Sequence, residues 1–197
     1  THPNSTAEPN PNCGVNLPSW GAPGAPNRVA RSDGAATEAM PLSKRVIRAM
    51  DDLISGHVDC FDWNSWSKAM EPFWTVDMVY DTNYVDASAQ PVLGNNTGLR
   101  DWFLHEHVPW NLAFPNCTFS QLIFAGEDAT ATTTTYASAL WAEDLAGIKA
   151  TGKPATIRIF DFYRMDVSQQ RIAYNWMLLD LVDLMHQSKP GHRVVPK

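Results

Sequence analysis

Apolar residues recur at helical spacing in two segments near the start of the patterned part of the chain. The first segment carries one apolar stripe, made of Val46, Ile47, Met50, Leu53 and Ile54. This spacing predicts a helix from Ser43, its expected N-cap, to about Cys60. A shorter helix is expected after Asp62 or Asn64 and is limited by Pro72. Its inward residues are Trp66, Ala69, Met70 and Phe73.

A strand, a loop and a third helix follow. Residues 76–81 predict a strand, and residues 82–96 predict a loop. Thr97 is the expected N-cap of the third helix, whose apolar face consists of Leu99, Trp102 and Phe103. This helix is expected to end near Val108, because Pro109 disfavours helical geometry in the residue before it.

From Thr118 onward the pattern becomes that of long strands. Apolar and β-branched residues predict four of them, at 118–126, 129–142, 155–165 and 171–183. Helices first and a meander of strands afterwards indicate an α+β fold. A long antiparallel sheet has to bury one face, so we expect it to curve around the N-terminal helices.

The chain divides into one domain and two flanking segments. Residues 1–41 are rich in proline, asparagine, glycine and alanine and lack apolar periodicity, which predicts an irregular N-terminal arm. At 197 residues the chain is long enough for one well-packed domain, which we place at residues 42–190. Residues 191–197 form a C-terminal tail.

The composition of the chain favours a small molecule as its partner over nucleic acid or a membrane. The formal net charge of −6 argues against nucleic acid or an anionic membrane. No apolar run reaches the roughly 18 residues of a membrane-spanning helix. Eight tryptophans are many for this length, and aromatic side chains fill cores and line ligand cavities. We therefore expect a small apolar molecule as the partner.

Cysteines and sequence motifs leave the compartment open. Cys13, Cys60 and Cys117 give neither a disulfide framework nor metal-ligand spacing, although one pair can bridge. Three glycosylation-type acceptor patterns begin at Asn4, Asn95 and Asn116, whereas no leader is visible, so both a cytoplasmic and a secreted protein remain open. No glycine-rich loop follows a strand in the context that phosphate binding needs, and we expect neither a cofactor nor a metal.

The strand expected at 155–165 carries one acid on an apolar face. Because side chains alternate along a strand, one face holds Ile157, Ile159, Asp161, Tyr163 and Met165. A carboxyl group among apolar neighbours loses hydration, which raises its pKa and suits general acid–base catalysis near neutral pH. The alternative is an ion pair with Arg158, Arg164 or Arg171. The two nearest arginines fall on the opposite face, which favours a cavity.

A set of motifs in the second half of the chain carries a family resemblance. The turn has Gly147, Ala150, Thr151, Gly152 and Lys153; the following strand has Asp161, Tyr163 and Arg164; the last strand and tail have Ile172, Trp176, Asp180, Leu184 and Gln187. Together with the helix start at residues 98–100, this pattern resembles the SnoaL-like polyketide cyclases and ester cyclases of the nuclear-transport-factor-like superfamily. The resemblance covers about residues 43–188.

The resemblance implies a cone-shaped α+β barrel that encloses an apolar cavity, and a homodimer formed through the outer face of the sheet. It also implies an aspartate, assisted by a histidine, that catalyses an intramolecular aldol closure; Asp161 is the matching acid. Trp141 and Asn175 stand where the family often has histidine, and Lys149 stands where its turn has proline.

Further candidates are acids and histidines near the expected cavity. Asp81, at the end of the first strand, is either a second acid or a solvated strand end. His105 and His107 point about 200° apart on a helix, so they cannot chelate one ion. Either one of them reaches the cavity as a general acid, or both belong to a helix end.

Aromatic and amide side chains complete the expected binding site. We expect Tyr80, Trp110, Tyr136, Trp141 and Tyr163 at the cavity wall. Either Asn175 or Trp176 shares the face of Asp161, and a one-residue shift in strand register decides which.

Two functions from different classes follow from these residues. The first is a cofactor-independent lyase, isomerase or cyclase that acts on a small apolar carbonyl compound through Asp161. The second is a non-catalytic module of the same fold that binds a ligand or dimerises.

Overall fold

The computed structural model describes residues 38–54, 61–83, 95–115 and 117–189. Most of the expected N-terminal arm, the end of the first helix, most of the 82–96 loop and the C-terminal tail lie outside the described residues. Cys13 and Cys60 lie outside them as well. Among the described residues no helix is both long and apolar enough to cross a membrane.

The described chain contains the expected helices and strands in the predicted order, together with a short strand, β2, and a C-terminal helix, α5, that the pattern does not predict. The helical segments are α1 (Leu42–Ile54), α2 (Trp63–Met70), α3 (Gly98–Trp102), the π-helix η1 (Phe103–His107), α4 (Val108–Ala113) and α5 (Leu181–Gln187). The strands are β1 (Trp74–Thr82), β2 (Asn95–Thr97), β3 (Thr118–Gly126), β4 (Thr130–Leu140), β5 (Pro154–Asp166) and β6 (Arg171–Leu179). The α+β class is confirmed.

All six strands of the described residues form one sheet in the order β2-β1-β6-β5-β4-β3. Neighbouring strands are antiparallel except β1 and β6, which pair in parallel. The expectation of a wholly antiparallel sheet is therefore wrong at one position. The chain between β1 and β6 is long enough for the crossover that a parallel pair requires.

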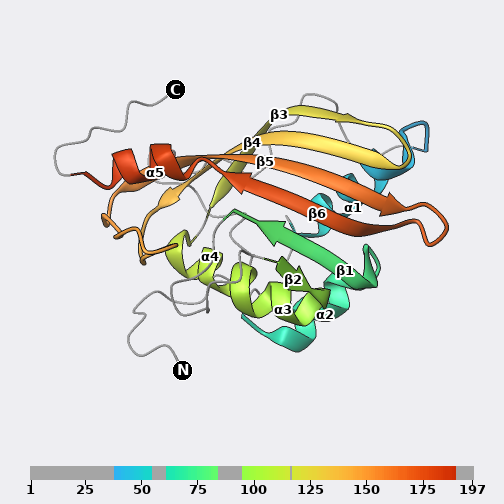
Figure 1. Cartoon of the computed structure of the whole chain (residues 1–197), viewed down its shortest axis with the longest axis horizontal. Helices are drawn as coiled ribbons and strands as arrows, with labels where there is room; N and C mark the ends of the chain where they lie inside the picture. The colour runs from blue at the N-terminus through green and yellow to red at the C-terminus, as the bar shows by residue number, and fades with distance from the viewer. Residues whose placement is uncertain (1–37, 55–60, 84–94, 116, 190–197) are drawn as a thin grey trace.

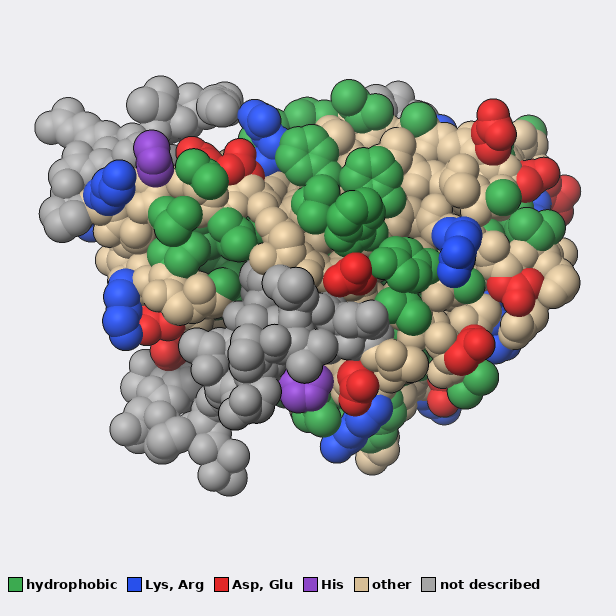
Figure 2. Space-filling view, in the orientation of Figure 1, with side chains coloured by type: hydrophobic (Ala, Val, Ile, Leu, Met, Phe, Trp, Pro, Cys, Tyr) green, Lys and Arg blue, Asp and Glu red, His purple; other side chains and the backbone are tan. Residues whose placement is uncertain are grey.

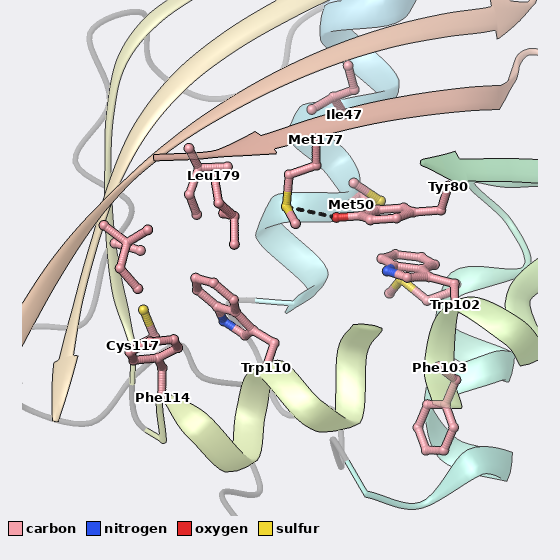
Figure 3. Close-up of a cluster of buried hydrophobic side chains, with 14 of the residues drawn as sticks. Ile47, Met50, Tyr80, Trp102, Phe103, Trp110, Phe114, Cys117, Met177 and Leu179 are labelled. Carbon is pink, nitrogen blue, oxygen red and sulfur yellow. Dashed lines mark hydrogen bonds between the residues drawn. The ribbon is translucent and has the colours of Figure 1, made fainter. Parts of the chain in front are cut away.

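The sheet is strongly curved, and α1, α3 and α4 lie on its inner side, whereas α5 lies at one end of the sheet (Figure 1). Helix α1 packs against β3, β4, β5 and β6, whereas α3 packs against β1, β2 and α2. Buried side chains from α1, β1, β6 and the α3–α4 region meet between these layers (Figure 3). This arrangement leaves the inward face of β5, and therefore Asp161, opposite the helices.

Helix α1 is fixed at its N-terminus by the β3–β4 hairpin. The backbone N–H of Leu42 donates to Asp128 Oδ1 at 2.8 Å, and the hydroxyl of Ser43 donates to the carbonyls of Glu127 and Thr130. Ser43 is thus the second residue of the helix rather than its N-cap. A Cβ added at Gly126 would lie 2.9 Å from Ser43 Oγ, so this contact needs glycine.

The helix expected to end near Val108 continues to Ala113 through a π-turn. Pro109 lacks an N–H and its ring would clash with the carbonyl of His105 in a regular α-helix. A wider turn avoids the clash, and the N–H of Val108 reaches back to the carbonyl of Phe103. Thr97 precedes α3 as expected, but its side chain makes no capping hydrogen bond.

The last strand is shorter than expected and is followed by a helix. Strand β6 ends at Leu179, and Asp180 caps α5 by accepting a hydrogen bond from the N–H of Asp183 at 3.0 Å. The side chain of Gln187 then bonds both backbone groups of Thr156, at 2.7 and 3.1 Å. Helix α5 therefore holds the start of β5 in place.

Candidate active site

A pocket of about 180 Å³ lies between the inner face of the sheet and the helices. Its aromatic lining residues are Trp66, Trp74, Tyr80, Trp102, Trp110, Phe119 and Tyr163. Its polar lining residues are Asp51, Glu106, His107, Asn111, Gln121, Thr133, Thr135 and Asp161. The pocket thus places polar side chains within a wall that is otherwise aromatic or apolar, as ligand sites commonly do.

Asp161 enters the pocket from the middle of β5. In the sheet it is paired with Thr133 of β4 and with Met177 of β6. Its Oδ2 accepts from the Thr133 hydroxyl at 3.4 Å, and its Oδ1 accepts from Asn175 Nδ2 at 3.3 Å. Two neutral donors therefore hold the carboxyl group in one orientation.

The pKa of Asp161 is raised from 3.8 to about 6, mainly because the surrounding protein removes hydration from the charged carboxylate. The donors on Asn175 and Thr133 oppose this rise. The expected alternative, an ion pair, does not occur among the described residues: Arg158 bonds the Tyr136 hydroxyl and Arg164 lies over the ring of Tyr174. Asp161 is thus poised to exchange a proton near neutral pH.

The register of β5 and β6 places Asn175, and not Trp176, on the same face as Asp161. Tyr163 is paired with Asn175, so Asn175 points inward beside Asp161 and is fully buried. Trp176 points outward, is 47% exposed and packs against Phe162. The expectation that Trp176 binds a ligand in the cavity is therefore wrong, because the side chains of β6 alternate between faces.

Tyr80 and Tyr163 both line the pocket, as expected. The ring of Tyr80 stacks on Trp102 with centroids 4.6 Å apart, and its hydroxyl donates to the sulfur of Met177 at 3.1 Å (Figure 3). Burial raises the pKa of the Tyr163 phenol, and the nearby carboxylate of Asp161 raises it further. Tyr163 therefore stays neutral and keeps its proton available for donation.

The π-helix η1 brings two titratable groups to the pocket. His107 lines it, with ring centroids 4.8 Å from Trp66 and 5.8 Å from Phe103. Glu106 also lines it and accepts a hydrogen bond from the indole of Trp102 at 2.6 Å. His105 is exposed and is not among the lining residues, so the two histidines are directed apart. Among the described residues no group of three potential metal ligands occurs.

Comparison with known protein families identifies the family of the chain. The model of the SnoaL-like polyketide cyclases matches residues 51–188, a span that contains most of the pocket. The chain belongs to the SnoaL-like polyketide cyclase family. A comparison with curated proteins gives no match.

Solved structures share the SnoaL-like fold. A SnoaL-like protein from Jannaschia sp. CCS1 is 11% identical, with 81% of this chain and 100% of that chain covered and a TM-score of 0.57. A SnoaL-like polyketide cyclase from Agrobacterium tumefaciens str. C58 is 15% identical, with 76% and 99% covered and a TM-score of 0.55. A protein from Acidithiobacillus ferrooxidans is 16% identical, with 79% and 100% covered and a TM-score of 0.54. At these identities the likeness shows the fold alone.

Three further residues expected in the cavity lie outside the pocket. Asp81 accepts a hydrogen bond from the Tyr174 hydroxyl at 3.0 Å, and the Tyr136 hydroxyl accepts from Arg158, both on the outer side of the sheet. Trp141 is buried just beyond the end of β4, where its indole donates to the carbonyl of Glu143 at 2.9 Å. Because side chains alternate along a strand, Asp81 and Tyr136 point away from the pocket. Trp141 is outside the pocket because it packs in the core. Trp110 lines the pocket as expected.

The pocket also contains residues that the sequence pattern does not indicate as functional. Gln121, Thr133 and Thr135 face inward from β3 and β4, and Asn111 and Glu106 come from the η1–α4 region. The alternation of side chains along the threonine-rich strand β4 indicates that Thr133 and Thr135 share one face of the sheet. No comparable signal existed for Glu106, because its direction depends on the π-turn.

Proposed function

We propose that this SnoaL-like protein is a cofactor-independent lyase, isomerase or cyclase that acts on a small carbonyl compound, with Asp161 as the general base. The observation that carries the proposal is the position of Asp161: a carboxyl group with a pKa near 6, held by two neutral donors inside an aromatic pocket. This combination is typical of catalytic acids and bases.

The proposed reaction begins at a carbon next to a carbonyl group. Asp161 takes a proton from that carbon, and the electron pair of the broken C–H bond moves into the carbonyl to give an enolate. The enolate carbon then attacks a second carbonyl in the same molecule, or accepts a proton at a new position. The proton held by Asp161 goes to the new alkoxide or to the enolate carbon, which restores the carboxylate.

Two groups of the pocket are suited to stabilise the enolate oxygen. The Tyr163 phenol keeps its proton because its pKa is raised, and the His107 imidazole has two ring nitrogens, of which at least one carries a proton that can be donated. Both line the same pocket as Asp161. We propose that His107, supplied by the π-helix, replaces the histidine that the family often places where Trp141 and Asn175 stand here.

Asp161→Asn is the variant that tests the proposal. The amide keeps the shape of the carboxyl group but cannot accept the proton, so the rate should fall about 10²–10⁴-fold. The assay is exchange of the hydrogens next to the carbonyl of 4-hydroxyphenylacetone in D₂O, followed by proton NMR. Asp81→Asn, which changes an acid outside the pocket, is the matched control and should keep the wild-type rate. Unchanged exchange in Asp161→Asn would end the catalytic assignment.

A dimeric assembly is a second proposal, and an apolar patch on the outer face of the sheet favours it. Phe160 is paired with Leu178, and Phe162 with Trp176. Phe162 and Trp176 are exposed, and Phe160 and Leu178 are half-buried. We call these four residues the outer patch; Figure 2 shows hydrophobic side chains gathered over β4, β5 and β6. The same surface fits the alternative of a non-catalytic dimerising module.

A further inference from the structure

Glu106 is a carboxyl group of the pocket that the proposed reaction does not use. It belongs to the π-helix η1, is 6% exposed and is one of the lining residues. Its Oε2 accepts a hydrogen bond from the indole N–H of Trp102 at 2.6 Å. Because Trp102 also lines the pocket, this bond holds the carboxyl group beside a ring of the pocket wall.

The charge of Glu106 acts on the same phenol as the charge of Asp161. Burial raises the pKa of Tyr163, and three carboxylates raise it further, namely Asp161, Asp51 and Glu106. Tyr163 is the lining residue that we place at the enolate oxygen. The carboxyl group of Glu106 thus contacts one lining residue and acts electrostatically on another. It reaches the pocket from η1, whereas Asp161 reaches it from β5, so the two carboxyl groups stand on different walls.

Glu106 is held where the helix changes its geometry. The hydrogen bond from Trp102 spans four residues and crosses from the end of α3 into η1. Residues four apart are neighbours on a helix face, so the contact is local and fixes the side chain with few other groups. Single π-turns inside α-helices occur frequently at functional sites. This irregular turn directs Glu106 and its neighbour His107 to the pocket.

The volume of the pocket limits the substrate to about one ring. An engineered protein cavity of about 150 Å³ holds benzene. The value of about 180 Å³ found here is close to that figure. A ring of this size touches opposite walls at once, so atoms on its opposite sides face different residues.

A reaction that moves a proton across such a ring needs a donor at the second position. Asp161 can return its proton to the carbon from which it came, but an atom on the far side of the ring is out of its reach. A carboxyl group acts as a general acid as well as a general base. Two carboxyl groups on different walls can therefore divide the transfer between them.

We propose that Glu106 is a second catalytic residue, a general acid that protonates the substrate at a position out of reach of Asp161, and that Trp102 is its positioning residue. In a cyclic ketone with a β,γ double bond, Asp161 removes a proton from the carbon between the two groups, and the electron pair forms a dienolate. Glu106 then gives its proton to the γ carbon as the carbonyl group re-forms. Proton exchange with water restores both carboxyl groups. This inference rests on the proposed function, because it needs Asp161 as the base.

Glu106→Gln tests the inference with 3-cyclohexenone as the probe in D₂O. The amide keeps the shape of the side chain and an acceptor for the Trp102 N–H, but it carries no acidic proton. Proton NMR follows two events in one sample. The first is exchange of the hydrogens between the carbonyl group and the double bond, which needs Asp161 alone. The second is conversion to 2-cyclohexenone with deuterium at the γ carbon, which needs both carboxyl groups. Conversion should fall about 10²–10⁴-fold in Glu106→Gln, whereas exchange should keep the wild-type rate.

A second variant and a control complete the experiment. Trp102→Phe keeps an aromatic ring and removes the N–H that holds Glu106. Conversion should fall relative to exchange in this variant, whereas a general disturbance of the pocket would slow both events alike. Asp101→Asn changes an exposed acid one residue earlier on α3 and should leave both rates unchanged. A melting curve verifies that each variant is folded.

The outcomes separate this inference from the proposed function. If exchange and conversion fall equally in Glu106→Gln, or if neither falls, the role of Glu106 is refuted while the role of Asp161 stands. If Asp161→Asn exchanges as fast as the wild type, the proposed function fails and the inference fails with it. A wild type that catalyses neither event would refute both.

Discussion

The carboxyl group of Asp161 is subject to two opposing influences. Loss of hydration raises its pKa, and the donors on Asn175 and Thr133 lower it, with a net value of about 6. The donors thus keep the group ionised over much of the neutral range, which a general base requires. Asn175 acts through Asp161 and is a positioning residue.

Removing the Asn175 donor should move the pH profile in a defined direction. Asn175→Leu takes away a hydrogen bond that favours the carboxylate, so the pKa of Asp161 should rise above about 6. The rate of proton exchange, which needs the ionised form, should then reach its midpoint at a higher pH. Trp176→Leu, the outward neighbour, is the control and should leave the midpoint in place. An unchanged midpoint in Asn175→Leu would show that the amide does not tune the acid.

At the scale of elements, the sequence predicted most helices and strands but not their irregularities. The alternation of side chains along β5 correctly predicted that Ile157, Ile159 and Asp161 share one inward face. Whether Asn175 or Trp176 joins them was open, because a register shift between Arg164 and Met165 affects the pairing of β5 with β6. Bulges of this kind depend on sheet twist and leave no clear sequence signal.

The helical region after β2 shows a second limit. Pro109 was interpreted as a helix end, but a π-turn accommodates it and directs Glu106 and His107 to the pocket. Sequence spacing alone does not distinguish a helix that stops from one that widens. By contrast, the strand expected to run to residue 183 ends at Leu179, because Asp180 accepts a hydrogen bond from the N–H of Asp183 and caps α5.

The cap of α5 gives a prediction for stability. Asp180→Ala removes the acceptor for the N–H of Asp183, which should lower the free energy of unfolding by about 0.5–2 kcal/mol. Urea unfolding measures this directly. Asp180→Asn is the control, since asparagine caps almost as well. A loss as large in the asparagine variant would show that the charge, and not the cap, matters.

For the whole molecule, the curved sheet separates two surfaces with different proposed roles. The inner face carries the pocket, and the outer face carries the outer patch. Because the two faces are formed by alternate residues of the same strands, a change on one face should leave the other nearly unaffected.

The outer patch provides a test of the proposed homodimer. Phe162→Glu and Trp176→Glu place charges in an apolar contact, which should convert a dimer to a monomer in light scattering at micromolar concentration. Val76→Glu, an exposed position on β1 outside the outer patch, is the control and should leave the mass unchanged. A monomeric wild type would contradict the proposal.

The most direct test of the account is the pH dependence of proton exchange in wild type and Asp161→Asn. The wild-type rate with 4-hydroxyphenylacetone should rise through an apparent pKa of about 6, as Asp161 ionises. The variant should show no such rise and should be about 10²–10⁴-fold slower above it. Because a raised pKa means that the ionised carboxylate destabilises the fold, the variant should melt no lower than the wild type at pH 7. Equal rates and the same pH profile in both proteins would contradict the central claim that Asp161 is the base.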